Sequence, residues 1–565
     1  MGLAAALAER LQPLADSLAD QSMARETGYS IARRLAAKIV TALIATTLLA
    51  ATGLIAFSLA PELGAAVIAA AMAPLLLPLA EYLRYKSAIS GRQKRLDIEY
   101  PFFMALSAII ARCGGSLYMA FKLIKNVKDI FPQTSKEAEE VERKAILARM
   151  GVLRAMEGHA QGIPHRAFSM SILTTTSVWR SGGDVATTLE SLSADALSYL
   201  SRKFQKYADD MAIFAEVMFI MLVLLPMGVA ISGIADPSMA ATIGLLMTGF
   251  VAPILGLVAY VIITSMAPTI NNFFEIKAEK IMLVVLAAVS ASLALTITAS
   301  LMGVMVPLTV AISIAVASSS IALHLMMREQ VREVEDTEME LRRYLRTVVE
   351  YRKLGLVMGE ALRRASAERY RQGFMKFIKA VSSRLAMGLG IYRAAAAARS
   401  WIARMIFWLL DVVDKFGGAS PQLLEKILDL LGRYSEARDT VKARTKIFVY
   451  LNYSCPFLLS SILAFLLPVL ELGVSLSPAF SPQLGAAQLF GQPSIQVEPL
   501  ADMIFLMLLI PSIFLAFSTS KGVELHPWKL IGVAITAAIY IPAYYLTLAL
   551  LPVTRSFLLG GWTPR

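Results

Sequence analysis

The chain has 565 residues, of which 57% are apolar and only 17% are charged, and its mean hydropathy is +0.62. A soluble protein carries roughly a quarter charged residues, so this composition excludes an ordinary soluble globular protein and indicates an integral membrane protein. The 54 lysines and arginines outnumber the 42 acidic residues and give a net charge of +12. In a membrane protein such an excess is typical of cytoplasmic loops, which argues against nucleic-acid binding.

The first 38 residues precede the apolar part of the chain and mix leucine, alanine and charge. They lack the basic start and short apolar core of a cleaved signal peptide, so we expect membrane entry to depend on internal helices. Leucines at positions 3, 7, 11 and 14 precede Arg33, Arg34 and Lys38. Two interpretations stay open for this cytoplasmic segment, an amphipathic helix at the membrane surface or a loosely ordered leader.

Nine apolar runs are long enough to cross a hydrocarbon core of about 30 Å. Very short turns at Pro61-Glu62, Asp236-Pro237 and Gly303 join three pairs of them into hairpins. No stretch of useful length shows strand alternation, so we expect an all-α, polytopic membrane protein. The expected spans cover residues 39–60, 63–83, 212–234, 239–264, 281–302, 303–327, 447–472, 501–519 and 529–552.

Basic residues lie on one side of these spans. They follow the second, fourth and sixth runs at Arg84, Lys280 and Arg328, and they flank the turn after the eighth. The longest opposite loop, residues 473–500, has four prolines and neither lysine nor arginine. The positive-inside bias therefore predicts a protein of the cell membrane with a cytoplasmic N-terminus, and with loop 473–500 and the tail 553–565 outside.

Two charged blocks of about 120 residues, 84–211 and 328–446, carry related glycine patterns. Gly182-Gly183 is echoed 235 positions later by Gly417-Gly418, and Gly115 is echoed 240 positions later by Gly355. Self-similarity at a nearly fixed offset indicates a duplication. The first unit comprises residues 39–83, 84–211 and 212–264, and the second comprises 281–327, 328–446, 447–472 and the first span of 501–552. Four spans per unit give a direct repeat with both blocks in the cytoplasm, and the ninth helix is an addition.

Each block is interpreted as a small bundle of helices. Leu189 and Leu192 recur at helical spacing in the first block, opposite a charged face. Asp184 and Ser420 follow the Gly-Gly pairs and are suited to cap the next helix, with Pro421 at its first position. We expect the glycines to turn the chain with positive φ. The turn residues are Gly114, Gly115, Gly182, Gly183, Asp184, Gly355, Gly417 and Gly418.

The sequence offers no residues for catalysis or for a cofactor. It has no G-x-x-x-x-G-K-[ST] phosphate loop and no G-x-S-x-G nucleophile elbow. The four histidines lack metal-ligand spacing, and the cysteines Cys113 and Cys455 are expected to be small buried side chains. We therefore expect a protein that is not an enzyme and that holds neither a metal nor a cofactor.

The first block carries a longer pattern of short motifs. Tyr100-Pro101-Phe102-Phe103 is followed by Gly114-Gly115-Ser116-Leu117 with Ala120-Phe121, then by Gly182-Gly183-Asp184 and a Leu-Glu helix that enters the membrane. This pattern resembles the F-domain of type II secretion and type IV pilus systems. Two copies in one chain of this length look like the archaeal platform proteins of archaella and adhesive pili. The second copy departs from the pattern, because Ala419-Ser420 replaces the aspartate that follows the first Gly-Gly pair.

The resemblance implies a non-enzymatic platform in the cytoplasmic membrane. A cytoplasmic hexameric secretion ATPase would dock on the helical blocks, and its movement would add pilin- or archaellin-like subunits to a filament. The resemblance also allows a homodimer and contact with membrane lipids, and implies no direct binding of nucleic acid. Basic residues of the second block are candidate ATPase contacts, and a solvated face attracted to anionic lipid is an equal interpretation. These residues are Arg342, Arg343, Arg346, Arg363, Arg364 and Arg369.

Two alternatives compete with this hypothesis. A DNA-uptake platform of the same superfamily would share its architecture. A nine-span secondary transporter would instead show inverted repeats and short cytoplasmic loops. The direct repeat and the two sizeable blocks favour the platform over the transporter.

Overall fold

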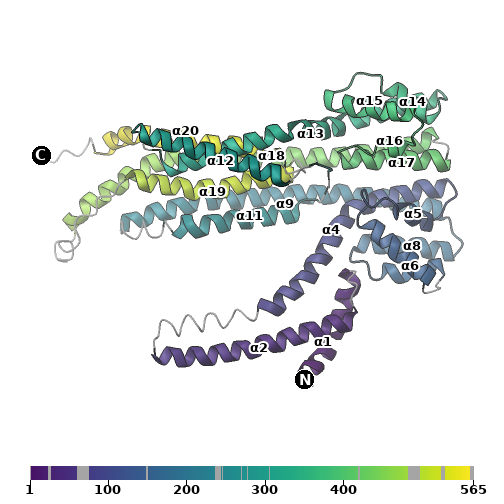
Figure 1. Cartoon of the computed structure of the whole chain (residues 1–565), viewed down its shortest axis with the longest axis horizontal. Coiled ribbons are helices and arrows are strands. Elements are labelled where there is room, and N and C mark those ends of the chain that lie inside the picture. The colour runs from purple at the N-terminus through teal and green to yellow at the C-terminus, as the bar shows by residue number, and fades with distance from the viewer. Residues whose placement is uncertain are drawn as a thin grey trace. The chain divides into compact units, whose positions relative to one another are not determined.

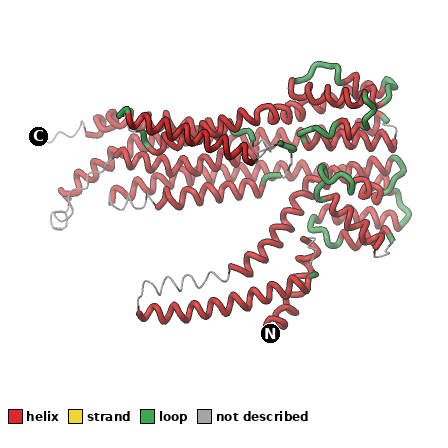
Figure 2. The backbone as a smooth tube through the Cα atoms, in the orientation of Figure 1, coloured by secondary structure: helices red, strands yellow, loops and turns green. Residues whose placement is uncertain are grey.

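The computed structural model describes residues 2–22, 27–59, 76–147, 151–235, 244, 246–268, 270, 272–275, 278–303, 306–417, 420–480, 497–523 and 528–559 (Figure 1). Within these ranges the chain consists of helices joined by turns, and no strand occurs (Figure 2). The chain divides into two compact units, Met1–Leu200 and Ser201–Arg565. The expected all-α fold is therefore confirmed.

The first unit is a helical bundle with an N-terminal helix packed on the α2 helix that follows it. Its core is aromatic, with the ring of Phe103 lying 4.7 Å from that of Phe121 and 5.3 Å from that of Phe168. The N-terminal segment is helical, and its Ala15 and Ala19 belong to a buried cluster with α2 residues such as Ile31, so it is not a loosely ordered leader. The helices are α1 (Gly2–Ser22), α2 (Gly28–Leu59), α4 (Leu76–Arg112), α5 (Leu117–Ile124), α6 (Thr134–Leu147), α7 (Val152–Ala160), α8 (Arg166–Arg180) and the start of α9 (Val185–Ala235).

The second unit combines a bundle of long apolar helices with a second, smaller helical bundle. Among the apolar helices, α13, α18, α19 and α20 pack against one another, while α11 packs on α19 and α12 on α13. The helices are η2 (Met247–Val251), α11 (Ala252–Met266), α12 (Ala278–Leu301), α13 (Leu308–Lys353), α14 (Met358–Ala365), α15 (Gln372–Ala386), α16 (Ile391–Ala394), α17 (Trp401–Gly417), α18 (Pro421–Phe480), α19 (Val497–Val523) and α20 (Ile531–Leu559).

Six helices in the described part of the chain are long and apolar enough to cross a membrane. They overlap the spans expected at 239–264, 281–302, 303–327, 447–472, 501–519 and 529–552, which supports a membrane protein. The predicted count of nine is not established. Residues 39–59 and 212–234 are helical in α2 and α9 but are not among the six, and most of 63–83 and the turns at residues 61–62 and 236–237 lie outside the described ranges.

Three expected boundaries differ from the structure. The predicted loop 473–500 is helical at both ends, because α18 continues to Phe480 and α19 begins at Val497. The predicted tail 553–565 is helical as far as Leu559. Hydropathy marks where an apolar run ends, whereas a helix continues as long as its backbone hydrogen bonds are made. The ninth helix, α20, which was expected as an addition to the repeat, packs against α13, α18 and α19.

The two blocks contain equivalent helices in the same order. A long entry helix (α4 or α13) is followed by an eight-residue helix (α5 or α14), a longer helix (α6 or α15), a short helix (α7 or α16), a penultimate helix (α8 or α17) and a long exit helix (α9 or α18). The largest difference among the inner helices is in the short one, which has nine residues in α7 and four in α16. This shared order supports the predicted duplication.

The first turn of each block shows that the repeat register differs by one residue from the predicted offset. Gly114 and Gly355 both have positive φ, +83° and +88°, so the equivalent of Gly355 is Gly114 and the offset is 241. The buried positions of the next helix then coincide. They are Leu117, Ala120, Phe121 and Ile124 in α5, and Met358, Ala361, Leu362 and Ala365 in α14. Glycine patterns alone misaligned the copies, because the first copy has two adjacent glycines and the second has one.

The second turn agrees with its prediction at Gly182 and Asp184, whereas Gly183 and Gly417 do not have the expected positive φ. Gly182 has φ +73°, and the Asp184 carboxylate accepts hydrogen bonds from the backbone N–H groups of Ala186 (2.9 Å) and Thr187 (3.2 Å) at the start of α9. In the second copy, Pro421 is the first residue of α18, as expected. Gly417 is the last residue of α17, whereas Gly418 lies outside the described residues.

Two side-chain contacts recur at equivalent positions. The last residue of each entry helix forms an ion pair with a glutamate of the exit helix, Arg112 with Glu190 and Lys353 with Glu425, with closest N–O distances of 2.5 and 2.6 Å. The N-cap of the penultimate helix also bonds an acid of the entry helix. His165 contacts Asp97 at 3.0 Å, and its equivalent Ser400 donates to Glu338 at 3.4 Å. The copies thus share side-chain geometry as well as helix order.

Glu99 is a residue of α4, and its buried carboxyl lies at the start of α6. Its oxygens accept backbone hydrogen bonds from Thr134 at 2.6 Å and Gln133 at 3.1 Å. Burial nevertheless raises the pKa of Glu99 from 4.5 to about 7, because no hydrogen bond fully replaces the lost hydration of the carboxylate. The protonated form therefore contributes stability below pH 4.5, and that contribution is lost as the pH rises through about 7.

We expect Glu99→Gln to flatten this pH dependence, since the amide cannot ionise. The full-length protein in detergent should lose thermal stability between pH 6 and pH 8.5, and the variant should lose less over the same interval. Glu157→Gln is the matched control, because Glu157 is a partly exposed partner of Arg180. An equally steep loss in Glu99→Gln would contradict the assignment to this carboxyl.

Candidate interaction site

The second bundle consists of α14 to α17 with the adjoining parts of α13 and α18. Its distal end exposes large apolar side chains. Two turns meet there beside the end of α17, the α13–α14 turn (354–357) and the α15–α16 turn (387–390), and Figure 1 shows α14 to α17 gathered at one end of α13. Leu354, Val357 and Met387 are each about three-quarters exposed, and Leu389 is 41% exposed. We call these four residues the tip patch.

Contacts to α17 hold both turns in place. The Tyr392 N–H, just after the α15–α16 turn, donates to Asp411 at 3.4 Å. Arg352, just before the α13–α14 turn, lies close enough to Asp414 to oppose the rise in the pKa of that carboxyl that burial causes. The Arg352 guanidinium also donates to the Leu356 carbonyl. The tip patch is therefore carried on turns anchored to the bundle.

A shared backbone device explains why leucine and methionine are exposed there. Leu354 and Met387 each directly precede a glycine with positive φ, Gly355 at +88° and Gly388 at +83°. The next N–H then returns to the helix, from Leu356 to the Tyr351 carbonyl and from Leu389 to that of Arg384. This hydrogen bond closes the helix end and leaves the side chain before the glycine directed outward.

The first bundle has no such apolar residues at the equivalent turn. Cys113 and Ser116 stand where the second bundle has Leu354 and Val357. The Ser116 hydroxyl accepts a hydrogen bond from the Met119 N–H and so caps α5. The α13–α14 turn therefore differs from the equivalent turn of the first copy, where a polar residue caps the next helix.

The six candidate arginines do not form one surface. Arg363 and Arg364 lie on α14, next to the tip patch, and pair with Glu360 at 3.6 and 3.1 Å. Arg342 instead faces α18, where it lies 3.6 Å from Glu436. A large part of each of these side chains is solvent-accessible, so such pairs contribute little stability.

The other three arginines differ in their contacts. Arg343 lies near Glu340 and Glu368 and 5.4 Å above the Tyr370 ring. Arg346 and Arg369 are exposed and form no ion pair with the residues that the structure describes. The basic residues in the sequence thus pointed to part of α14, but they did not point to the tip patch. An apolar residue directly before a helix-ending glycine, as in Leu354-Gly355, was the available signal.

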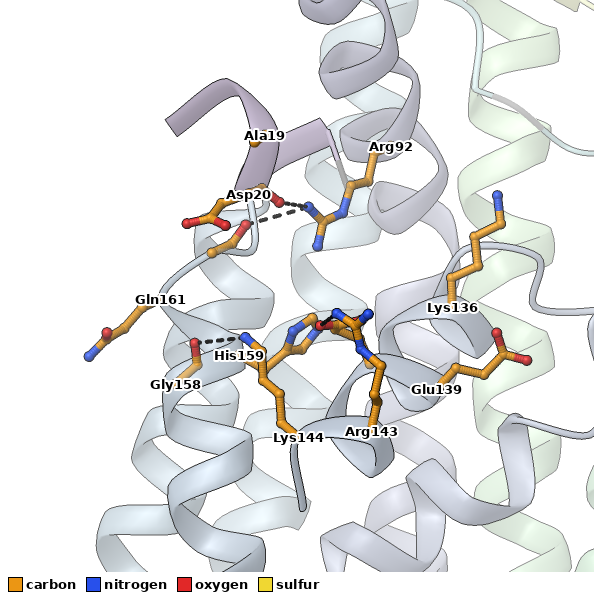
Figure 3. A pocket seen from close by; sticks show the side chains of 12 residues that line it. Ala19, Asp20, Arg92, Lys136, Glu139, Arg143, Lys144, Gly158, His159 and Gln161 are labelled. Atoms are coloured by element: carbon orange, nitrogen blue, oxygen red, sulfur yellow. Dashed lines mark hydrogen bonds and ion pairs between the residues drawn. The ribbon is translucent and has the colours of Figure 1, made fainter. Parts of the chain in front are cut away.

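A cavity of about 700 Å³ lies in the first unit between α1, α6 and α7 (Figure 3). At its base, Arg92 donates to Glu137 at 2.8 and 2.6 Å and to the carbonyls of Asp20 and Gln21. His159 bonds the same carboxylate at 2.8 Å. Despite burial, the hydrogen bonds from His159 and Arg92 lower the pKa of Glu137 to about 2. These groups satisfy one another, so the base of the cavity is a structural junction that ties α1 to the bundle.

The two cysteines and the metal-binding side chains were also considered in the sequence. Cys455 is buried as expected, whereas Cys113 is only partly buried. No group of three metal-binding side chains occurs in the searched part of the chain. None of the known protein families, curated proteins or solved structures matches this chain.

Gly355→Ala tests whether positive φ shapes the tip. Alanine in a left-handed conformation costs about 1–2 kcal/mol, so we expect a lower unfolding temperature. Gly359→Ala is the matched control four residues on, because Gly359 lies inside α14 with open space at its Cβ position and alanine favours helix by about 1 kcal/mol. Thermal unfolding in detergent should separate the two, and equal stability of both variants would contradict the constraint.

Proposed function

We propose that the protein is a platform of the cytoplasmic membrane that couples a cytoplasmic secretion ATPase to the assembly of a type IV pilus-like or archaellum filament. The observation that supports this most directly is the continuity of the second bundle with the membrane helices. Helix α13 runs unbroken for 46 residues and α18 for 60 residues. At a rise of 1.5 Å per residue, these helices are about 70 and 90 Å long. A push at the tip is then carried by rigid helices rather than by linkers.

Contacts at both ends of its apolar stretch fasten α13 to other membrane helices. At one end, the Asp502 carboxylate on α19 accepts from the N–H groups of Leu308 (3.1 Å) and Thr309 (3.0 Å). At the other end, Lys529, just before α20, bonds Glu335 at 2.9 Å. A displacement of α13 would therefore move α19 and α20 with it.

The segment between α11 and α12 is also tied to the second bundle. The Phe273 N–H donates to the Arg399 carbonyl at 2.8 Å, and the Asn272 side chain accepts from the Trp401 N–H at 3.0 Å. The Arg404 guanidinium lies 3.6 Å from the centre of the Phe273 ring. Since α12 packs on α13, the bundle is linked both to the helix it continues and to that helix's neighbour.

The tip patch suits a protein partner with an acidic rim. Protein interfaces commonly have an apolar centre surrounded by polar groups, and here Arg363 and Arg364 lie in the last turn of α14, the helix that follows Val357. The ATPase would contact this end of the second bundle, and the pilin-like subunits would contact the membrane helices. Positive charge on one side and negative charge on the other would speed association.

Two variants test the contact. Leu354→Asp/Met387→Asp removes the apolar centre, and Arg363→Glu/Arg364→Glu reverses the adjacent charge. Each should lower co-purification of the ATPase at least tenfold, because both desolvated apolar contact and charge complementarity are lost. Membrane insertion and the elution volume in detergent should not change, since all four side chains are exposed.

Matched controls lie elsewhere on the same bundle. Met339 on α13 is 52% exposed and outside the tip patch, so Met339→Asp should leave co-purification intact. Arg433 pairs with Asp429 four residues earlier, as Arg364 does with Glu360, and Arg433→Glu should also be silent. Full ATPase recovery with both tip variants would refute the proposed contact.

A further inference from the structure

A second polar cavity lies where α13 leaves its apolar stretch. Its volume is about 350 Å³, and its two walls are one face of α13 and the first turns of α15. The α13 residues are three or four positions apart, a spacing that places them on the same face of a helix. The lining residues are Leu325, Arg328, Glu329, Arg332 and Glu333 of α13, with Gln372, Gly373 and Lys376 of α15.

The acidic side chains of this cavity already have cationic partners. Glu329 is paired with Lys376 at 2.5 Å, and Glu333 is paired with Arg399. Arg328 and Arg332 are exposed and form neither an ion pair nor a hydrogen bond with the residues that the structure describes. The cavity therefore presents two guanidinium groups, one helical turn apart, whose charge is not compensated.

The same face of α13 becomes apolar toward the membrane. Leu325 is one turn from Arg328 and is 58% exposed, and Ile321 is one turn further and 45% exposed. Both lie in the apolar part of α13 that is long enough to cross a membrane. An apolar strip thus leads directly into a cationic cavity, at the level where lipid acyl chains meet their headgroups.

We propose that this cavity binds the headgroup of an anionic phospholipid. The phosphate would lie between Arg328 and Arg332, whose guanidinium groups match phosphate oxygens in charge and geometry, and an acyl chain would lie along Leu325 and Ile321. A volume of about 350 Å³ is within the range of small-ligand pockets. The bound lipid would bridge α13 and α15 and hold the second bundle against the membrane surface.

The first bundle lacks this site. The residues 241 positions earlier on α4 are Ser87 for Arg328 and Gly91 for Arg332, with Ala88 between them. The cations on that face of α4 are Arg84, Arg92 and Arg95, which stand where α13 has Leu325, Glu333 and Asp336, so neither arginine position is occupied by a cation. The proposed pair of arginines is therefore a feature of the second copy, and one lipid per chain is expected in this cavity.

The test uses the full-length protein in nanodiscs of phosphatidylcholine with a minor share of phosphatidylglycerol. After extraction into mild detergent, native mass spectrometry counts the phosphatidylglycerol molecules that stay bound. Arg328→Gln/Arg332→Gln should weaken phosphatidylglycerol binding about 10- to 30-fold, the loss expected for two cations near a membrane surface. Arg328→Lys/Arg332→Lys keeps the charge and should restore part of the affinity.

Controls decide between specific and general attraction. Lys379→Gln/Arg393→Gln removes two exposed cations of the same bundle outside the cavity and should leave binding unchanged. Equal loss in that control, or no loss in the arginine variant, would overturn the proposal. Inorganic phosphate and glycerol 3-phosphate at millimolar concentration should not displace the lipid. Displacement by either would instead identify a site for a soluble phosphate compound.

Discussion

The structure depends on the unbroken hydrogen-bond ladder of α13. This helix begins beside the Asp502 carboxylate, crosses the apolar bundle and continues to the positive-φ glycine at its far end. Between these ends, the buried ion pair of Glu338 with Arg438 joins it to α18. A break in α13 would remove one of the two continuous helices, α13 and α18, that join the tip to the membrane helices.

Both proposed sites adjoin this helix, and they suit different ligands. At the distal end, exposed leucine and methionine with cations beside them suit a folded protein surface. Near the membrane, two arginines without acidic partners suit a phosphate group. One helix would therefore connect the proposed protein-binding surface with the proposed lipid-binding surface.

Much of the architecture could be predicted from the sequence, and the reasons for the failures are specific. Apolar runs and charged blocks reflect the cost of burying charge in lipid, so the class of protein and the two blocks could be predicted from the sequence. The repeat register was missed by one residue, because Gly114 and Gly115 are identical in sequence and differ only in φ. The tip patch was missed because exposure is decided by tertiary packing. Composition cannot tell exposed Leu354 from buried Leu362.

The unequal lengths of α7 and α16 carry an evolutionary consequence. A gene that doubles can keep one copy under the old constraints while the other drifts. Here the first bundle has a polar, capped turn and the longer α7, whereas the second has the shorter α16 and a positive-φ glycine at the end of α15. Under the proposed duplication, division of labour between the two bundles is the expected result, with the first serving as scaffold and the second free to acquire new ligands.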